Sequence, residues 1–371
     1  MIRVCFVCGN IYPLLVSLPE TAIVGGAEVQ QYLIGAALAQ RGFEVCYVTE
    51  DYGQGFETAV GGSRVFAYSF GRNKIKQGVS LWQALRQSDA DIYYVRGMPK
   101  FGMMIFSFCR IQRRLIVQAL ANDVEVVPHG VVAPGDRLLY QVHAAWRARA
   151  DLVIAQTQYQ RENLKHRWNT DAVVVPNVVR VPGYPKGPGR AGSMTVLWVA
   201  SISPRKRVEL VGELAQRVPE AQFIVVGGPA RKMEAYYDKM RPQVAAFPNV
   251  RWCGYVPYEQ IGGYFRAADV FLHTGDGRRE GFPNVFLEAW ANGVPTLSLG
   301  TNPDRLISQQ SLGFCYASIG QAAEGLRRLS IDRTLLREMG QRAWKYVSVV
   351  HAPDVVIPRY VELFSQLTCR G

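Results

Sequence analysis

The sequence predicts an α/β protein of two domains, each a parallel sheet covered by helices, that face each other across a cleft. Short apolar runs alternate with longer helical patterns along the whole chain, which is typical of such sheets. The 371 residues exceed what a single hydrophobic core usually holds. Segment 181–192, with four Gly and three Pro, separates two such series. We therefore expect two Rossmann-like domains, with ligands bound beyond the carboxyl ends of the strands, in the cleft.

Each series contains short apolar runs that are typical of buried parallel strands. Those of the first series are Ile2–Cys8, Glu44–Thr49, Ile92–Val95, Leu115–Ala119, Leu152–Ala155 and Ala172–Val175. Those of the second are Thr195–Ala200, Gln222–Val226, Val250–Cys253, Val270–His273, Thr296–Leu299 and Phe314–Tyr316. Helical patterns such as Ala27–Gln40 and Leu138–Arg149 lie between them.

The charge of the chain is unevenly distributed. The net charge is +12, and residues 72–167 hold 15 Lys or Arg against 7 Asp or Glu, which leaves +8. Residues 1–71 hold 3 against 6, which leaves −3. A basic surface on the first domain would attract anionic lipid headgroups, a phosphorylated acceptor or nucleic acid. A basic protein without a specific anionic partner is the alternative.

The expected lack of a signal peptide and of a membrane-spanning helix, together with the cysteine pattern, indicates a cytoplasmic location. No run of eighteen apolar residues is present, so no membrane-spanning helix is expected. The apolar N-terminal run ends at Gly9 and Asn10, too early for a signal peptide. The seven cysteines are scattered and odd in number, which favours free buried thiols in a reducing compartment.

Glu280 and Glu288 form the most informative pair of residues. Glu280 follows the strand-like run that ends in Leu272 and His273, and Glu288 lies about one turn inside a helix that Gly293 ends. Pro283 is acceptable in the first turn of that helix, because its missing N–H would have no partner there. Free amides and the positive end of the helix dipole favour a phosphate, and the two carboxylates favour hydroxyl groups.

The run from Glu280 to Pro295 resembles the signature of family 4 glycosyltransferases, which are retaining enzymes of GT-B fold. The pattern is Glu, seven residues, Glu, and a small-residue run ending in Gly-x-Pro. The resemblance implies that Glu280 binds hydroxyls of the donor sugar and supports an oxocarbenium-like transition state, while Glu288 holds the ribose. The connecting residues are placed in the donor site as well: Gly281, Phe282, Pro283, Asn284 and Val285.

The same resemblance implies that the two domains bind different substrates. Residues 1–180 would bind the acceptor, and residues 181–351 would bind a UDP- or GDP-linked sugar. The final helix, about 352–371, would pack back onto the first domain. The expected reaction moves a sugar to a saccharide or lipid-linked acceptor, as in polysaccharide biosynthesis, with no cofactor besides the nucleotide-sugar substrate.

Gly25 and Gly26 lie before a helix that follows the first strand. Glycines at a helix N-terminus let a phosphate approach the backbone closely. Their position resembles that of the family's glycine loop, which faces the donor diphosphate. A simple loop turn is the alternative.

The segment Leu197–Arg207 resembles the family's strand-to-helix segment whose Lys binds the donor phosphates, and that Lys matches Lys206. An ammonium beside a diphosphate stabilises the charge that develops on the leaving group. Many relatives have Gly-Arg where this chain has Ala200 and Ser201, so a second phosphate ligand is missing. Arg205 or Arg207 could compensate, although neither occupies the same position.

Two further turns complete the expected donor site. Gly228 lies in the Gly-rich turn after the strand Gln222–Val226, and Tyr255 and Val256 follow the next strand. They resemble segments near the nucleotide and its base. Both are also ordinary turns at strand ends.

No metal is expected at the site. Asp89-Ala90-Asp91 has the D-x-D spacing of a metal ligand, but it precedes a strand and so lies at the wrong edge of a parallel sheet. We interpret it as a helix-to-strand loop. Lys206 and helix dipoles would then supply the electrostatic stabilisation.

The acceptor side departs from the resembled family. A His near the transferred sugar follows the strand Leu115–Ala119 in many relatives, whereas this chain continues with Asn122 and Asp123. Either of these two residues could replace it, and His129, next to Gly130, is more typical of a loop.

Segment Pro99–Arg114 combines an apolar helix with a basic end, which would suit peripheral contact with an anionic membrane through residues 72–167. Apolar residues on nearly every side of this helix favour packing against the sheet instead.

Two other functions of the protein are alternatives. A nucleotide-dependent oxidoreductase is disfavoured because G-x-G-x-x-G is missing after strand one. A non-catalytic binder of sugars or nucleic acid is disfavoured by intact Glu280, Glu288 and Lys206, so no nucleic acid partner is expected.

Overall fold

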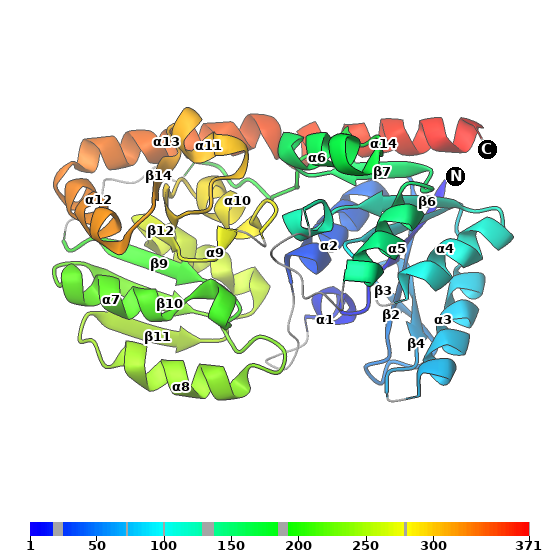
Figure 1. Ribbon diagram of the computed structural model, residues 1–371, viewed down its shortest axis with the longest axis horizontal. Helices are drawn as coiled ribbons and strands as arrows, with labels where there is room; N and C mark the ends of the chain where they lie inside the picture. The colour runs from blue at the N-terminus through cyan, green and yellow to red at the C-terminus, as the bar shows by residue number, and fades with distance from the viewer. Residues whose placement is uncertain are drawn as a thin grey trace. The chain divides into compact units, whose positions relative to one another are not determined.

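The structure, a computed structural model, describes residues 1–17, 25–71, 73–98, 101–127, 137–184, 192–277 and 280–370 (Figure 1). The chain forms two compact units. Unit 1 holds Met1–Val178 and Pro353–Gly371, and unit 2 holds Val179–Ala352. Most of the Gly- and Pro-rich segment 181–192 lies outside the described residues, since 185–191 are not among them.

The described part of unit 1 has one sheet with the strand order β3-β4-β2-β1-β5-β6-β7-β8. The strands are β1 (Arg3–Val7), β2 (Glu44–Glu50), β3 (Glu57–Val60), β4 (Ser63–Tyr68), β5 (Ile92–Arg96), β6 (Leu115–Ala119), β7 (Leu152–Ala155) and β8 (Val173–Val174). All neighbours pair in parallel except β3 and β4, which are antiparallel. The predicted parallel sheet is confirmed, but the sequence analysis did not predict β3 and β4, and β3 adds an antiparallel edge strand.

Helices cover both faces of this sheet (Figure 1). They are α1 (Tyr12–Leu15), α2 (Gly26–Ala39), α3 (Lys74–Ser88), α4 (Gly102–Ile111), α5 (Arg137–Arg147) and α6 (Gln158–Trp168). Helix α4 buries Ile105, Phe106 and Phe108 in one core cluster with residues of α3 and of the strands. The prediction that this helix packs on the sheet is confirmed, although Met103 and Ile111 are exposed.

The C-terminal helix α14 (Pro353–Arg370) belongs to unit 1. It packs against α2. Arg41 at the end of α2 forms an ion pair with Asp354 at 2.9 Å, and the rings of Phe43 and Phe364 lie 6.4 Å apart. The chain thus closes on the first unit after completing the second.

Unit 2 has a fully parallel sheet in its described part, with the strand order β11-β10-β9-β12-β13-β14. The strands are β9 (Thr195–Val199), β10 (Gln222–Val226), β11 (Val250–Gly254), β12 (Val270–His273), β13 (Thr296–Leu299) and β14 (Gly313–Tyr316). Successive residues of β9 enter different core clusters, with Val196 and Trp198 in one and Leu197 and Val199 in the other. The sheet is therefore buried on both faces.

The helices of unit 2 are α7 (Glu209–Arg217), α8 (Glu234–Ala245), α9 (Tyr258–Ala267), α10 (Asn284–Ala291), α11 (Leu306–Gln309), α12 (Ile319–Ile331) and α13 (Arg333–Val350). Helix α13 packs closely on the end of α10, because a Cβ on Gly340 would lie only 2.2 Å from the Gly293 carbonyl oxygen. Gly293 has a φ of 69°, and it follows the end of α10 as predicted.

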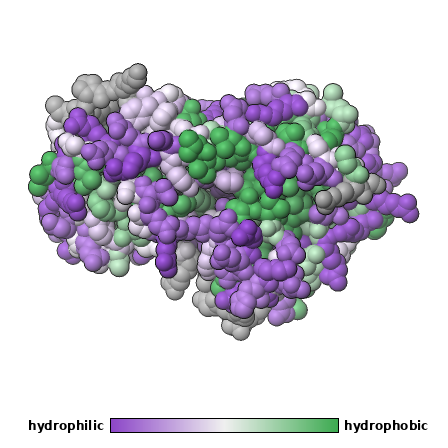
Figure 2. Space-filling model, turned by 90° about the horizontal axis from the view of Figure 1, so that it is seen from above, coloured by the Kyte–Doolittle hydropathy of each residue, from purple (hydrophilic) through white to green (hydrophobic). Residues whose placement is uncertain are grey.

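No helix among the described residues is long and apolar enough to cross a bilayer. The space-filling view shows hydrophilic side chains interspersed with smaller hydrophobic groups over the face it presents (Figure 2).

Candidate functional site

The strand order of unit 2 identifies the region of its sheet where a ligand is expected. Strand β9 lies between β10 and β12. After β9 the chain adds β10 and β11 on one side and then crosses to β12 on the other, so the strand order reverses beside β9. Open parallel sheets bind ligands beyond the carboxyl ends of strands at such a switch point. The segment that carries Lys206 follows β9, and the segment that carries Glu280 follows β12.

Lys206 and Glu280 meet at this position. Lys206 ends a 3-10 turn (Pro204–Lys206), and its ammonium is hydrogen-bonded to the Glu280 carboxylate. The side chains are 20% and 18% exposed, so the ion pair is largely shielded but reachable from solvent. Two residues predicted for the diphosphate and the sugar are thus brought together.

The electrostatics of the pair keep Glu280 ionised. Burial is the largest single effect and would raise the pKa of the Glu280 carboxyl, but Lys206 and the neighbouring His273 act against it, and the pKa is lowered from its usual value. The charge of Arg205 also lowers the pKa of Glu280, with a smaller effect.

Backbone contacts hold the two segments together. The Asp276 amide donates to the Arg205 carbonyl at 2.9 Å, and Thr274 Oγ1 donates to the Lys206 carbonyl at 2.5 Å. Trp198 on β9 donates from its indole Nε1 to Thr274 Oγ1 at 2.8 Å. The position of the Lys206 backbone is therefore fixed by groups of both strands.

His273 is a site residue that the sequence analysis did not identify. It ends β12, is 3% exposed, and packs edge-on against Phe286 of α10 with ring centroids 4.9 Å apart. Within the described chain neither ring nitrogen has a hydrogen-bond partner. Burial lowers the pKa of His273 to about 3, and the nearby Lys206 ammonium acts in the same direction. The ring is therefore neutral, and only its position as the last residue of a strand, shortly before Glu280, could have pointed to it.

Glu288 lies on α10, one turn beyond its start. Pro283 is the residue before the helix, with a φ of −64° and a ψ of 121°, so it precedes the first turn instead of lying within it. Burial raises the pKa of Glu288 to about 7. Phe282 is buried against Trp290 and His351, which anchors the Gly281–Val285 segment.

The remaining donor-side candidates lie at the carboxyl ends of neighbouring strands. Gly228 lies beside Tyr255, since a Cβ on Gly228 would be 3.2 Å from the Tyr255 Cβ. Its carbonyl accepts from the Ile202 amide at 2.8 Å, next to the exposed Ser201. Val256 is half-buried. These turns therefore converge with Ser201 on the same edge of the sheet as Lys206.

In unit 1, Gly25 precedes α2 and Gly26 begins it. A Cβ on Gly25 would lie 2.6 Å from Glu28 Oε2, so the Glu28 carboxylate folds back over this helix end. Burial raises the pKa of Glu28, while hydrogen bonds from the Glu28 and Gly25 amides oppose the rise. A diphosphate at these amides would have to displace that carboxylate.

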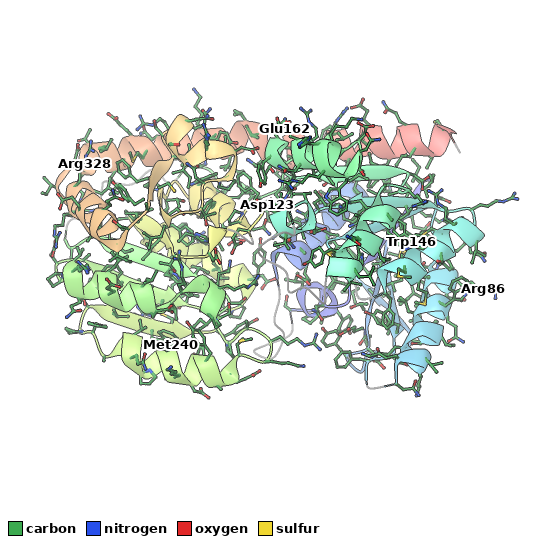
Figure 3. All side chains as sticks on the ribbon, viewed as in Figure 1. Arg86, Asp123, Trp146, Glu162, Met240 and Arg328 are labelled. Carbon is green, nitrogen blue, oxygen red and sulfur yellow. The ribbon has the colours of Figure 1, made fainter. Side chains whose placement is uncertain are left out.

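Asn122 and Asp123 follow β6 in unit 1. Asp123, labelled in Figure 3, accepts a hydrogen bond from Gln160 Nε2 at 2.9 Å. Asn122 Oδ1 is buried without a partner in the described residues, and the Asn122 amide donates to Glu125 at 3.0 Å. His129 lies outside the described residues.

Asp89 and Asp91 form ion pairs with arginine side chains. Arg3 contacts both carboxylates, Asp89 at 2.6 Å and Asp91 at 3.3 Å, and Arg114 pairs with Asp89 as well. The hydrogen bond from Arg3 lowers the pKa of Asp89. The interpretation as a loop between α3 and β5 is confirmed. The described residues contain no cluster of three or more His, Cys, Asp or Glu that could hold a metal.

Solved structures share this fold over almost the whole chain. Sucrose-phosphate synthase from Thermosynechococcus elongatus matches with a TM-score of 0.81 at 18% identity, covering 100% of both chains. HepE from Anabaena in complex with UDP-glucose matches with a TM-score of 0.78 at 18% identity, covering 99% of this chain and 100% of that one. The two parallel-sheet α/β domains define a protein of GT-B fold.

The family follows from the sequence comparisons. The model of Glycosyl transferases group 1 matches residues 186–346, and that of Glycosyltransferase Family 4 matches residues 24–181. The chain belongs to the group 1 glycosyltransferase family.

Curated relatives are similar over unequal lengths. One subunit of human phosphatidylinositol N-acetylglucosaminyltransferase is 22% identical over 88% of this chain and 68% of its own length. The exopolysaccharide phosphotransferase SCO2592 of Streptomyces coelicolor is 36% identical over 109 residues, which are 28% of this chain and 11% of that protein.

Proposed function

We propose that the protein is a retaining glycosyltransferase that moves a sugar from a nucleotide-diphosphate sugar to a saccharide or lipid-linked acceptor, without a metal ion. The observation that carries this proposal is the Lys206–Glu280 pair beyond β9 and β12, next to the start of α10. A cation for a diphosphate and a carboxylate for sugar hydroxyls are placed side by side there.

The leaving group sets the first chemical requirement. Cleavage of the bond between sugar and diphosphate leaves negative charge on the phosphate oxygen, which Lys206 stabilises directly. Arg205 is exposed and lies within electrostatic reach of Glu280, so it supplies the second cation that Ser201 cannot. Arg207 does not, because its guanidinium is engaged by backbone carbonyls.

The sugar sets the second requirement. The ionised Glu280 accepts hydrogen bonds from donor hydroxyls and stabilises positive charge that develops on the ring during transfer with retention. Glu288 accepts from the ribose hydroxyls. Because Glu280 acts on charge that exists only in the transition state, its contribution belongs to turnover more than to binding.

UDP- and GDP-linked sugars both suit this site, and the ligands bound in similar structures favour testing UDP first. Anabaena HepE is described in complex with UDP-glucose, and Staphylococcus aureus TarM in complex with UDP. A lipid-linked acceptor is supported by the phosphatidylinositol in the name of the human relative.

Contact with an anionic membrane through residues 72–167 would bring the protein to such an acceptor from the cytoplasmic side. In this region Ile75 and Met103, from the neighbouring helices α3 and α4, are 80% and 49% exposed, and Lys74 and Lys76 flank Ile75 on the chain. Apolar side chains next to cations suit the surface of an anionic bilayer.

A thermal-shift panel tests the donor class. Wild-type protein is heated with UDP, GDP, ADP and their sugar conjugates, with no metal added. Binding to the folded state raises the melting temperature by mass action. We expect a shift with one nucleotide that Glu288→Ala abolishes and Asp89→Asn retains. No shift with any nucleotide would contradict the proposal and favour a non-catalytic binding protein.

A further inference from the structure

Arg207 has an unusual backbone conformation next to the proposed phosphate ligand. Its φ is 50° and its ψ is 52°, in the left-handed region that residues other than Gly, Asn and Asp rarely adopt. Such a conformation is strained for a residue with a side chain and persists where the surroundings hold it in place. Glycine would adopt it without strain, so the Arg207 side chain must be favoured for what it contacts.

The Arg207 guanidinium binds backbone carbonyls at the ends of two different strands. Its Nε donates to the Thr274 carbonyl at 2.5 Å, and its Nη2 donates to the carbonyls of Gly275 and Leu299, each at 3.0 Å. Thr274 and Gly275 follow β12, and Leu299 ends β13. One side chain therefore ties the segment after β9 to the ends of two other strands.

Thr274 both accepts a hydrogen bond from segment 205–207 and donates one to it. Arg207 donates to the Thr274 carbonyl, while Thr274 Oγ1 donates to the carbonyl of Lys206. The Asp276 amide closes the other side by donating to Arg205. Segment 205–207 and segment 274–276 thus form a clasp, with Lys206 in the middle of one half and Glu280 four residues beyond the other.

We infer that Arg207 is a positioning residue, which holds Lys206 and Glu280 at the separation that the transfer reaction needs. This inference rests on the proposed function. The clasp fixes the backbone of Lys206 to segment 274–276, which leads toward Glu280 along the chain. The Lys206–Glu280 ion pair alone cannot do this, because in the proposed reaction both side chains also bind the substrate. Arginine suits this role better than lysine, because its planar fork donates several hydrogen bonds in fixed directions.

The test compares two Arg-to-Gly substitutions that relieve the same kind of strain. Arg113 has a φ of 52°, is exposed, and lies between α4 and β6, at the amino edge of the sheet of unit 1. Sugar transfer or donor hydrolysis is measured in solution, without vesicles, for Arg207→Gly, Arg113→Gly and Arg207→Lys. We expect Arg207→Gly to lower kcat roughly 100-fold, as misplacement of catalytic groups by about 1 Å can do. Donor KM should change much less, Arg207→Lys should be intermediate, and Arg113→Gly should match wild type.

A second readout does not depend on activity. The rate at which acetic anhydride modifies Lys206 is followed by mass spectrometry, with Lys74 as an internal reference. We expect faster modification in Arg207→Gly, because Lys206 leaves Glu280 more often when the clasp is open. Should Arg207→Gly fail to fold, Arg207→Lys is judged by the same two measurements.

The outcomes separate this inference from the proposed function. Wild-type kcat and wild-type Lys206 labelling in the Arg207 variants would overturn the positioning role. If the wild-type protein transfers no sugar from any donor, the proposed function fails, and unchanged Lys206 labelling would then also refute the clasp.

Discussion

Lys206 and Glu280 form an ion pair although they are 74 positions apart in the chain. Each follows a strand of the same parallel sheet, and β9 and β12 are hydrogen-bonded neighbours at the point where the strand order reverses. The fold therefore brings together a cation and an anion that the chain keeps distant. Each side chain of the pair neutralises the charge of the other, and in the proposed reaction a donor with a diphosphate and hydroxyls would replace each partner.

Glu280→Gln should lower turnover far more than donor affinity. The amide keeps the size of the side chain but loses the charge that stabilises the transition state, so kcat should fall roughly 100-fold or more. Donor affinity, measured by calorimetry, should stay within about threefold because ground-state hydrogen bonds are largely retained. A variant with wild-type kcat would refute this role for Glu280.

Arg205→Gln should weaken donor binding. Arg205 is the exposed cation beside Lys206, and removing its charge-assisted contact with the diphosphate should raise donor KM roughly tenfold. Arg217→Gln is the matched control, since Arg217 forms an i,i+4 pair with Glu213 on α7. Equal KM values for the two variants would show that Arg205 does not replace the missing Arg at Ser201.

The stability of the protein should depend on pH through Glu288. Burial raises its pKa in the folded state to about 7, above the usual value of 4.5, so the folded protein binds this proton more tightly than the unfolded chain does. The contribution of Glu288 to stability is therefore complete below pH 4.5 and is lost as the pH rises toward 7. Glu288→Gln cannot ionise, so the melting temperature of the variant minus that of wild type should increase between about pH 5 and about pH 8. A difference that is constant across this range would contradict the assignment.

Chelators should leave the reaction unaffected. The D-x-D segment is occupied by Arg3 and Arg114, so it is not expected to hold a metal for the diphosphate. Activity in excess EDTA should equal activity with added magnesium, and Asp89→Asn should behave as wild type in both. Loss of activity in EDTA that magnesium restores would show that the proposed metal independence is wrong.

The sequence predicted most strands within a residue or two, because buried parallel strands are continuous apolar runs between helices. It missed β3 and β4, where exposed and buried residues mix at a sheet edge. A signal was present, since Gly61 and Gly62 connect the two strands with φ values of 58° and 82°, as in a two-residue hairpin turn.

Site residues could be predicted from the sequence only where they belong to a motif with a known chemical role. Glu280 and Lys206 belong to a recognisable pattern, and the structure brings them together. Arg207 and His273 do not, because their importance arises from contacts with backbone carbonyls and with Phe286 that only the fold creates. The contact of the Glu28 carboxylate with the helix end at Gly25 is another example. The sequence does not distinguish a helix N-terminus with free amides from one whose amides already bind a side chain.

The most direct test of the central claim is the release of nucleoside diphosphate from a nucleotide-sugar, followed by mass spectrometry with EDTA present. Wild-type protein and Glu280→Gln are compared on UDP- and GDP-linked sugars, with a mixture of simple saccharides as acceptors. We predict that wild type releases the diphosphate from one donor class and that Glu280→Gln retains donor binding but releases it far more slowly. Equal release by both proteins, or none by wild type from a donor that it binds, would contradict a glycosyl transfer centred on Lys206 and Glu280.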